Sequence, residues 1–416
     1  MCTSFVRLTL LVATLAVFAC SSPAASPSIA ADAGSDVSAA PNGFAHDVVL
    51  SIALTVPPGS ELHQCQYVQL PAGADLNVVR IAHEYTPGSH HFLVFRTDLT
   101  SIPADATGQY DCTRGDEPIM DHSRGVLYAG QSARGDFPFP AGVGFTMTGG
   151  AVVLFQTHYI NAGASDLAVR VDLGLDTAPP EVIQQKAGFL TFYDPFIDLP
   201  ARGAASSGIR CPIPSDINLL TGITHYHQRG TGMKVYVDPG AGAPASTPLF
   251  ETHDWEHAAA FAGPAPIKAG STLRFGCEFD NASGADEIFQ GPNARTSEMC
   301  VFAGLYYPVP GDSTFETCRA PSIVGSGPKG CLDVASCIQA CPASEAPNET
   351  WSGVQVGPCW QRCVASGCDG AVDAFFPLGN CVSSQCSAEC DAGRCTACIT
   401  ARCADALSTC SSQTCK

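Results

Sequence analysis

The sequence has 416 residues, of which 14% are charged and 45% are hydrophobic, with 40 glycines and 31 prolines. This length accommodates two or three domains with buried cores, and the many turn-forming residues are typical of a β protein rather than a helical one. The 39 acidic and 21 basic residues give a net charge of −18. Such a charge is repelled by phosphate backbones, which argues against nucleic acid as a partner.

The first residues are typical of an export signal. Arg7 precedes an apolar run, residues 8–19, that is too short to span a bilayer but has the length of a signal-peptide core. The run leads into Cys20 and resembles a bacterial lipoprotein cleavage site, at which the cysteine is lipidated and begins the mature chain. We therefore predict a signal peptide over residues 1–20 and an exported protein, either an outer-membrane or periplasmic lipoprotein or a secreted one.

Another cleavage site is open. Phe18 is bulky for a lipoprotein signal, and ordinary signal-peptide cleavage near Ala30 is the alternative. The membrane is expected as a partner only through the lipid anchor, because no other stretch is long and apolar enough to cross it. Residues 21–43 are rich in proline, serine and alanine and have no periodicity, which predicts a flexible linker.

Regular structure is expected from about residue 44, and its pattern is that of strands. In residues 50–56 apolar residues alternate with small or polar ones, which is the period of a half-buried strand. Similar runs bounded by turn residues predict further strands at 78–81, 92–95, 151–158, 169–175, 189–192, 234–238, 271–279 and 300–307. No long amphipathic helix is evident before residue 320, and the segment 176–180 is the expected domain junction.

The predicted fold is therefore all-β, with two antiparallel jelly-roll-like β-sandwich domains over residues 44–178 and 179–320. The composition changes after a glycine-rich stretch, since fourteen of the 22 cysteines lie between Cys331 and Cys415. A module this small and this rich in cysteine is stabilised by disulfides rather than by a large core. We predict a disulfide-rich, α-helical tail over residues 329–416.

The cysteine spacing in the tail predicts helices joined by disulfides. Three cysteine pairs are separated by four residues, so that both sulfurs emerge on one helix face and two antiparallel helices can be joined twice. These pairs are Cys337/Cys341, Cys359/Cys363 and Cys386/Cys390. The blocks 331–368 and 381–415 look like two loosely similar copies. Cys395 and Cys398 have the C-x-x-C spacing of a metal site, which remains the alternative.

Histidines occur in three settings that can bind a metal ion. His90 and His91 follow a proline–glycine turn, and two neighbouring strand residues need such a turn or a bulge to reach one ion. His158 closes an apolar strand, a position that by itself is more typical of a core histidine. His225 and His227 are separated by one residue, so both imidazoles face one side of a strand and can bind the same ion.

The order and context of these motifs resemble the copper type II, ascorbate-dependent monooxygenases, the family of the peptidylglycine- and dopamine-hydroxylating enzymes. The likeness covers about residues 44–320. Four motifs stand in the family's order, namely PGSHH at 87–91, THYIN at 157–161, HYH at 225–227 and TSEMC at 296–300. Four ordered motifs are more specific than any one of them.

The resemblance implies two copper ions per chain, separated by a solvent cleft. The expected ligands are His90, His91 and His158 for the electron-accepting copper, and His225, His227 and Met299 for the catalytic copper, where dioxygen reacts. Three imidazoles accommodate both copper oxidation states, whereas a thioether favours Cu(I). The implied activity is hydroxylation of a C–H bond of a small organic substrate, with ascorbate or a similar reductant as electron donor.

The resemblance also implies the disulfides Cys65–Cys112, Cys211–Cys318 and Cys277–Cys300, the last of which would fix the strand that presents Met299. The alternative role of Met299 is core packing beside that disulfide. Two other functions remain open for the whole chain. One is an exported protein that binds or buffers copper without turnover, and the other is an adhesion module formed by the tail on an inactive scaffold.

The sequence departs from the family where substrate is bound. The peptide-hydroxylating branch holds a substrate carboxylate with an arginine, an asparagine and a tyrosine, and these positions are Ile223, Val301 and Ala303 here. An apolar set cannot compensate a buried carboxylate, so a neutral or weakly polar substrate is expected. The alternative is that Arg229 or Arg295 restores the positive charge.

The other histidines have no motif around them; they include His63, His83, His122, His253 and His257. The segment 253–257 is an alternative metal patch, although a solvated loop is the favoured interpretation.

Overall fold

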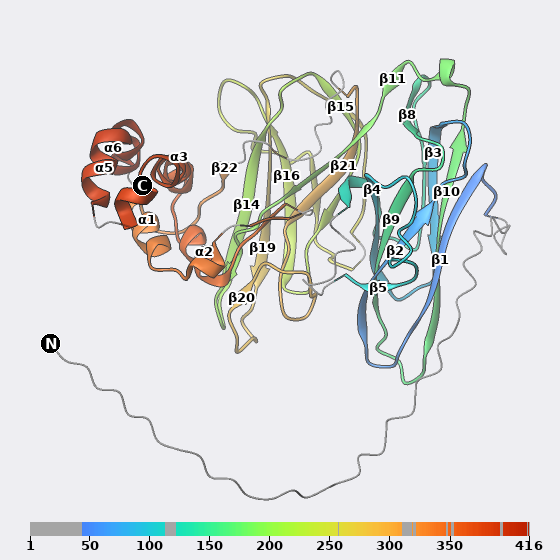
Figure 1. Ribbon diagram of the computed structural model, residues 1–416, viewed down its shortest axis with the longest axis horizontal. Helices are drawn as coiled ribbons and strands as arrows, with labels where there is room; N and C mark the ends of the chain where they lie inside the picture. Colours follow the sequence, from blue (N-terminus) through green and yellow to red (C-terminus); the bar gives the residue numbers. More distant parts are fainter. Residues whose placement is uncertain are drawn as a thin grey trace, which may run out of the picture. The chain divides into compact units, whose positions relative to one another are not determined.

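The computed structural model describes residues 44–112, 122–256, 258–309, 318, 322–346, 348–350, 353–391, 394–413 and 415 (Figure 1). The predicted signal peptide and linker lie outside these residues. Within the described residues, strands up to residue 323 form two β-sandwiches, and helices dominate the tail after residue 330. The predicted fold class, two jelly-roll-like sandwiches followed by a disulfide-rich helical tail, is confirmed.

The first sandwich consists of two sheets. Its strands are β1 (Val48–Val56), β2 (Glu61–Gln69), β3 (Leu76–Tyr85), β4 (Ser89–Thr97), β5 (Tyr110–Asp111), β6 (Ser123–Gly130), β7 (Arg134–Pro138), β8 (Val143–Met147), β9 (Val152–Ile160), β10 (Leu167–Thr177) and β11 (Gln185–Lys186). One sheet has the order β1-β10-β3-β8-β11, with β7 also paired to β3, and the other has the order β5-β2-β9-β4-β6. Among these pairings, that of β11 with β8 is parallel and the others are antiparallel.

Strand β9 is buried on both faces. Its residues from Val152 to Tyr159 are all buried, although His158 is among them. On one face Val153 and Phe155 belong to the core between the two sheets. The opposite face carries His158 and a smaller apolar cluster that includes Leu154. A strand buried on both faces needs cover on both, so the outer face of this sheet must be packed against another part of the chain.

The first sandwich extends beyond the junction that the sequence suggests. A short 3-10 helix, η2 (Pro180–Val182), follows β10, and β11 then returns to pair with β8. The pairing of the first sandwich therefore runs to Lys186, past the predicted boundary at residue 178. The prolines at the predicted junction mark the turn before β11.

The second sandwich also has two main sheets. Its strands are β12 (Gly188–Tyr193), β13 (Asp198–Leu199), β14 (Ala204–Pro212), β15 (Ile217–His225), β16 (Gly230–Asp238), β17 (Phe250–Thr252), β18 (Phe261–Ile267), β19 (Thr272–Asp280), β20 (Ile288–Phe289), β21 (Val301–Tyr307) and β22 (Ser322–Ile323). The sheets have the orders β12-β21-β15-β18 and β17-β16-β19-β14-β22, and β13 pairs with β20. Apolar side chains between these sheets form the second core.

An apolar surface joins the two sandwiches. Phe189 on β12 and Ala303 and Leu305 on β21 are buried in the same cluster as the core of the first sandwich. Leu190 and Phe302, which alternate with them along the strands, belong to the second core instead. The sheet β12-β21-β15-β18 therefore has one face in its own core and the other against the first sandwich, because side chains alternate along a strand.

The three disulfides implied for the sandwiches are present. Cys65 pairs with Cys112, Cys211 with Cys318 and Cys277 with Cys300. The last of these joins β19 to the residue that precedes β21. It therefore fixes the backbone next to Met299, as the resemblance implies.

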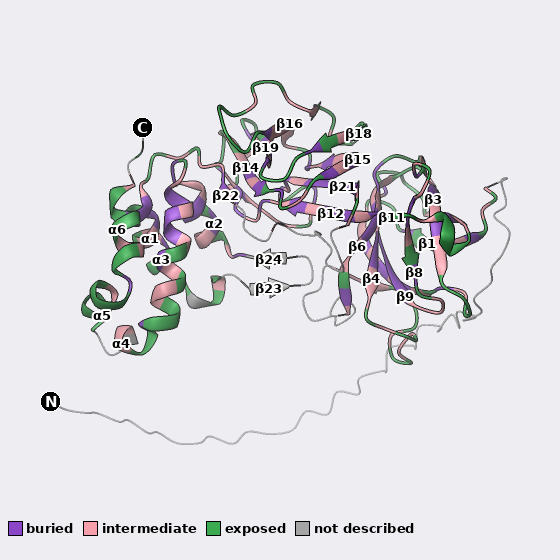
Figure 2. Ribbon diagram, turned by 90° about the horizontal axis from the view of Figure 1, so that it is seen from above, coloured by how far each residue is buried: buried purple, intermediate pink, exposed green. Residues whose placement is uncertain are grey.

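The tail is helical and densely cross-linked. Its helices are α1 (Cys331–Gln339), α2 (Pro358–Ala365), α3 (Ala371–Gln385), α4 (Ser387–Asp391), α5 (Cys395–Arg402) and α6 (Ala404–Ser412), with a 3-10 turn η3 (Ala343–Glu345) and a two-stranded sheet of β23 (Asn348–Thr350) and β24 (Gly353–Gln355). All fourteen tail cysteines form seven disulfides. Figure 2 shows that α4, α5 and α6 are largely exposed, so these disulfides replace a core there.

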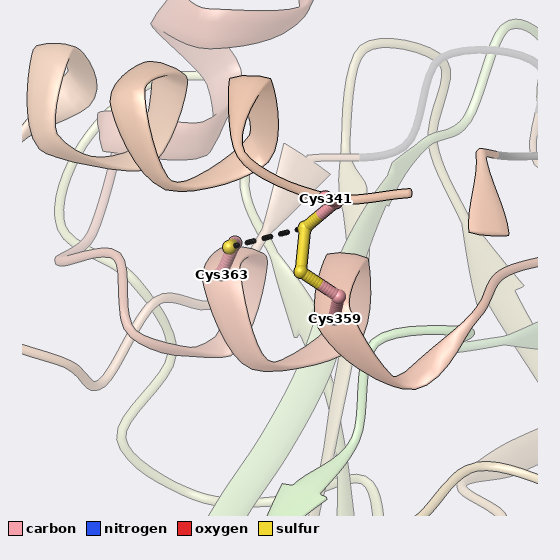
Figure 3. A group of neighbouring side chains, drawn as sticks. All are labelled: Cys341, Cys359 and Cys363. Carbon is pink, nitrogen blue, oxygen red and sulfur yellow. Dashed lines mark hydrogen bonds between the residues drawn. A yellow bond between two sulfur atoms is a disulfide. The ribbon is translucent and has the colours of Figure 1, made fainter. Parts of the chain in front are cut away.

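The predicted double connection between helices occurs at α1 and α2. Cys337 pairs with Cys363 and Cys341 with Cys359, so two helices with four-residue cysteine spacing are joined twice. Figure 3 shows the Cys341–Cys359 bond beside the sulfur of Cys363, which lies 3.7 Å from that of Cys341. The three sulfurs are close enough to suggest a metal site, but each belongs to a disulfide and none is a thiolate.

The metal-site alternative for the C-x-x-C pair is wrong. Cys395 is bonded to Cys390 and Cys398 to Cys386, so neither thiol is available. These two bonds repeat the double connection of α1 and α2. Disulfides Cys331–Cys410 and Cys368–Cys415 then tie the two halves of the tail together.

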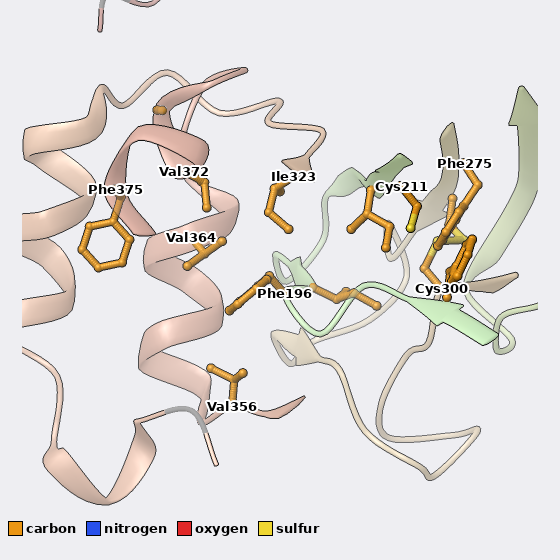
Figure 4. Close-up of a cluster of buried hydrophobic side chains, with 14 of the residues drawn as sticks. Phe196, Cys211, Phe275, Cys300, Ile323, Val356, Val364, Val372 and Phe375 are labelled. Carbon is orange, nitrogen blue, oxygen red and sulfur yellow. A yellow bond between two sulfur atoms is a disulfide. The ribbon is translucent and has the colours of Figure 1, made fainter. Parts of the chain in front are cut away.

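The tail packs on the second sandwich and shares its core. In Figure 4, Phe196 and Ile323 of the sandwich lie against Val364 and Val372 of α2 and α3, and all four are buried in one cluster. The short strand β22 contributes by pairing with β14. The tail is thus a continuation of the second sandwich.

Ion pairs border this contact. Both terminal nitrogens of Arg210 donate to the Asp369 carboxylate at 2.8 and 2.9 Å, and Arg362 pairs with Glu287. A paired guanidinium and carboxylate match each other's geometry, which orients the tail on the sandwich.

The disulfides place the protein in an oxidising compartment, in agreement with the predicted export. Among the residues described, we find no helix with the length and apolar character needed to cross a membrane.

We predict that the second sandwich and the tail unfold together. Phe196→Ala removes a ring that is 6% exposed between them and should lower the free energy of unfolding by about 3 kcal/mol, measured by denaturant titration. Leu332→Ala on α1, where the side chain is 45% exposed, is the control and should change little. Separate transitions for sandwich and tail in the wild-type protein would contradict the shared core.

Candidate metal centre

The His-His motif lies on a bulged strand, as its spacing predicts. In β4, Ser89 is opposite Tyr159 and His91 is opposite His158, so the register shifts at the residue between them. Gly88 has φ +106°, a conformation that favours glycine, in the turn before β4. The side chain of His90 lies outside the part of the chain that the structure describes.

Three histidines form a row across three neighbouring strands. His63 on β2 and His91 on β4 are both directly opposite His158 on β9. The rings of His63 and His158 are stacked with centroids 3.7 Å apart, and those of His91 and His158 meet edge to face at 5.1 Å. His158 is fully buried and His63 is 7% exposed. The row lies on the outer face of the sheet, away from the core of the first sandwich.

Glu61 is a buried carboxylate beside this row. Its Oε1 accepts a hydrogen bond from His158 Nε2 at 2.9 Å and lies 3.8 Å from His63 Nε2, and the side chain is 3% exposed. Burial alone would raise the pKa of Glu61, but hydrogen bonds from His158 and the Ala294 backbone lower it below its usual range. Glu61 therefore carries a negative charge inside the protein.

The second sandwich supplies the other partners of Glu61. Asn293 Nδ2 and Arg295 Nε both donate to Oε2 at 3.2 Å, and the Ala294 backbone N–H donates to Oε1 at 3.2 Å. These three residues precede the TSEMC motif in the sequence. The carboxylate thus joins the histidine row of the first sandwich to the loop that leads to Met299.

The second histidine pair lies at the end of β15. His225 is the last residue of the strand and His227 follows it by two, with ring centroids 5.3 Å apart and planes at 88°. Tyr226 between them is fully buried in the second core. The two imidazoles therefore leave the strand on the side opposite Tyr226, as their spacing predicts.

Glu298 holds the backbone around His227. Its carboxylate accepts the backbone N–H groups of His227 at 2.9 Å and Arg229 at 2.8 Å, and the residue is fully buried. Burial raises the pKa of Glu298 to about 7, although these N–H groups favour the charged form. His227 Nδ1 also lies 3.0 Å from the Ser297 carbonyl. Met299 follows directly, so its backbone is next to the groups that fix His227.

Among the side chains that the structure describes, the two histidine clusters meet where a cleft between them was expected. The rings of His91 and His225 are in edge-to-face contact with centroids 4.8 Å apart. Together with the contacts above, this makes one continuous file of five imidazoles: His63, His158, His91, His225 and His227. The expectation of separation was wrong because the apolar surface between the sandwiches draws β4 and β15 together.

His158 and His227 are neutral at ordinary pH. Burial lowers the pKa of His158 to about 4 and that of His227 to about 3. A neutral imidazole has a lone pair for a metal ion, whereas a protonated one repels it. The donor set of imidazoles and one buried carboxylate is one that copper accepts.

His63 and Glu61 were missed by the sequence analysis. The only signal for them is their i, i+2 spacing at the start of β2, which places both on the face that also carries Cys65. Their partner His158 is 95 or more residues away in the sequence, so only the pairing of β2 with β9 joins them. Two other histidines without a motif have their own partners. His83 lies within hydrogen-bond distance of Tyr128 and Ser132, and His122 pairs with Asp98.

The alternative metal patch at 253–257 finds little support. His253 Nδ1 lies 3.2 Å from the carbonyl of Thr231 and is exposed. His257 lies outside the described residues.

The predicted apolar set lies beside His225. Ile223 is two residues before His225 on β15, Ala303 is opposite Ile223, and Val301 is opposite His225 on β21. Ile223 and Ala303 both pack against the core of the first sandwich.

The candidate arginines differ in how fully they are engaged: Arg229 Nη1 is buried without a hydrogen-bond partner among the described residues. Arg295 pairs with Glu61, and Arg229 Nε donates to Asn281 Oδ1 at 3.2 Å. The neighbours of His225 on β15 and β21 are apolar, and Arg229 remains the alternative source of positive charge.

Comparisons with known proteins add little. No family model matches the sequence, and a search of curated proteins finds no match. A solved structure described as "The Triple Jelly Roll Fold and Turret Assembly in an Archaeal Virus" is similar over 61% of this chain and 58% of that chain, with 8% sequence identity and a TM-score of 0.19. A similarity at this TM-score supports no conclusion about function.

We predict that Glu298 is needed to hold the His225–His227 segment. Glu298→Ala leaves the buried N–H groups of His227 and Arg229 without an acceptor, so the free energy of unfolding should fall by about 3 kcal/mol in denaturant titrations. Glu278→Ala is the control, because this carboxylate forms an exposed pair with Lys234. Equal stability of the two variants would show that Glu298 is dispensable.

Proposed function

We propose that the chain is an exported copper-dependent monooxygenase that hydroxylates a C–H bond of a small organic substrate, with dioxygen and an ascorbate-like reductant. The observation that carries the proposal is the file of five imidazoles drawn from both sandwiches, of which His63, His158 and His227 are buried. Such a set requires a cation or a dense hydrogen-bond network to offset its burial. The four ordered sequence motifs supply the identity of the metal.

The proposed ligand sets follow the motifs. They are His90, His91 and His158 for one copper and His225, His227 and Met299 for the other. When bound, copper supplies one-electron transfer and the reaction with dioxygen.

The chain's own residues hold and shield these ligands. Glu298 and Ser297 fix His227, and Glu61 fixes His158. The apolar contact between the sandwiches excludes bulk water, which strengthens the electrostatic interactions within the site.

A second candidate function is copper binding or buffering without turnover. The edge-to-face contact of His91 and His225 favours it, because touching rings leave no room for a substrate between them. Oxygen consumption separates the two functions, since only an enzyme consumes dioxygen with ascorbate in a substrate-dependent manner.

We further propose that the chain is a lipoprotein anchored through Cys20 in the outer membrane or periplasm. The Ala19-Cys20 boundary after an apolar run supports this placement. Mass spectrometry of the mature N-terminus separates a lipidated Cys20 from cleavage near Ala30.

We predict two copper ions per chain with independent signals. His225→Ala and Met299→Ala should each alter one of two Cu(II) signals in electron paramagnetic resonance and leave the other in place. Metal analysis of the purified protein gives the stoichiometry. A single copper per chain, or tight zinc binding in preference to copper, would contradict the two-site scheme.

We also predict a preference for neutral substrates. Ile223, Val301 and Ala303 offer no donor to a carboxylate, and desolvating an unpaired anion costs several kcal/mol. Turnover of a glycine-extended peptide should therefore be slower than that of its neutral amide by more than about tenfold. Faster hydroxylation of the free carboxylate would mean that Arg229 or Arg295 supplies the charge.

A further inference from the structure

Three groups from two neighbouring strands converge beside the predicted copper ligands. Glu61 Oε1 lies 2.9 Å from His158 Nε2 and 3.8 Å from His63 Nε2, and the three atoms all lie within 4.8 Å of one another. The exposed fractions are 3%, 0% and 7% for the side chains of Glu61, His158 and His63. Two imidazoles and one carboxylate are a common ligand set for divalent transition metals.

The spacing of these atoms fits ligands of one ion. Bonds of about 2.0–2.2 Å from nitrogen and oxygen to a metal place two ligand atoms about 3–3.5 Å apart at tetrahedral or right angles. The distances of 2.9 and 3.8 Å lie close to this range on either side. Small movements of side chains would bring all three atoms into the first coordination sphere of one ion.

A stabilising role does not explain why the His63 side chain is buried beside Glu61. A hydrogen bond between Glu61 and His158 alone would order the His158 ring, as carboxylates do for many histidines. His63 Nε2, however, is buried and has no hydrogen-bond partner among the described residues, since 3.8 Å to Glu61 exceeds hydrogen-bond length. An unpaired nitrogen in this setting costs free energy unless a ligand binds it.

We propose that Glu61 Oε1, His63 Nε2 and His158 Nε2 bind the copper ion of the first sandwich. The proposal deepens the proposed function by giving this ion two ligands that the sequence motifs omit. It depends on that function only for the identity of the metal. When copper binds, His158 changes tautomer: the proton leaves Nε2 and Nδ1 takes up a proton, so that the neutral ring offers its Nε2 lone pair to the ion.

The carboxylate sets the character of this ion. A hard, negatively charged oxygen favours Cu(II) over Cu(I), whereas the thioether of Met299 favours Cu(I) at the other site. The ion at Glu61 is then the better electron donor, and electrons pass from the first sandwich to the second. Glu61 Oε2 remains bonded to Asn293 and Arg295, so the site also ties the histidine row to the loop before Met299.

The test uses the full chain carrying His225→Ala, which leaves the ion of the first sandwich to be measured alone. Cu(II) affinity is measured by competition with a chelator of known affinity. His63→Ala in this background should weaken binding at least about a hundredfold, because loss of a group that merely supports a ligand already costs 10–100-fold. His122→Ala, at an exposed histidine paired with Asp98, is the matched control and should bind as its parent does.

If the Cu(II) affinity of His63→Ala lies within about threefold of that of its parent, the proposal is overturned. Should that variant fold poorly, His63→Gln keeps a polar side chain of similar size and takes its place. X-ray absorption of the parent ion gives an independent readout. A carboxylate oxygen beside the imidazole ligands, lost in Glu61→Gln, supports the assignment, and a set of imidazoles without such an oxygen refutes it.

This test is separate from that of the proposed function. Copper held at Glu61, His63 and His158 without substrate-dependent oxygen consumption would refute the monooxygenase and leave the ligand assignment intact. If the protein consumes oxygen in a substrate-dependent manner but its copper affinity does not change in His63→Ala, the ligand assignment is refuted and the monooxygenase is not.

Discussion

Strand β9, at the centre of the sheet β5-β2-β9-β4-β6, is buried on both faces, and the candidate site depends on how the outer face of this sheet is covered. A sheet on the edge of a sandwich usually presents polar side chains to water. Here the outer face carries the apolar cluster around Leu154 together with His63, His91 and His158. The segment 99–112 of the first sandwich covers the apolar cluster. The second sandwich covers the histidine end of this face, where His225 contacts His91 and the loop 293–295 contacts Glu61.

Once that face is covered, its buried carboxylate and imidazoles need hydrogen-bond partners within the protein. A buried carboxylate or imidazole is costly unless hydrogen bonds or charges offset the loss of water. Glu61 meets this demand with four hydrogen bonds, three of them from the second sandwich. Glu298 meets it with backbone N–H groups of the turn that carries His227. The two carboxylates therefore fix the two ends of the histidine file: Glu61 bonds His158, and Glu298 bonds the backbone of His227.

The tail, which packs on the second sandwich, is stabilised in a different way from the sandwiches. Its outer helices bury little, so their order comes from disulfides that shorten the loops of the unfolded chain. Its inner helices α2 and α3 bury Val364, Val372 and Phe375 in the sandwich core. This sharing makes the tail part of the scaffold that holds β14, β19 and the Cys277–Cys300 disulfide. The arrangement gives the tail a structural role that does not depend on adhesion.

The sequence by itself determined the local features of this protein. Alternating side chains predicted the strands, the proline–glycine turn predicted the bulge at the His-His pair, and four-residue cysteine spacing predicted the doubly joined α1 and α2. These are properties of a few consecutive residues, and short-range geometry decides them. The same holds for the outward direction of His225 and His227.

Tertiary structure alone decided which of these features meet. His63 lies opposite His158 only because β2 pairs with β9, and the Glu61 carboxylate finds its partners in a loop more than 230 residues away. The contact of His91 with His225 depends on how the two sandwiches pack, since apolar burial is non-directional and does not fix a register in the sequence. The histidines of the three sequence motifs could be named from local patterns, but their order along one continuous file, with Glu61 and His63 at its end, required the three-dimensional fold.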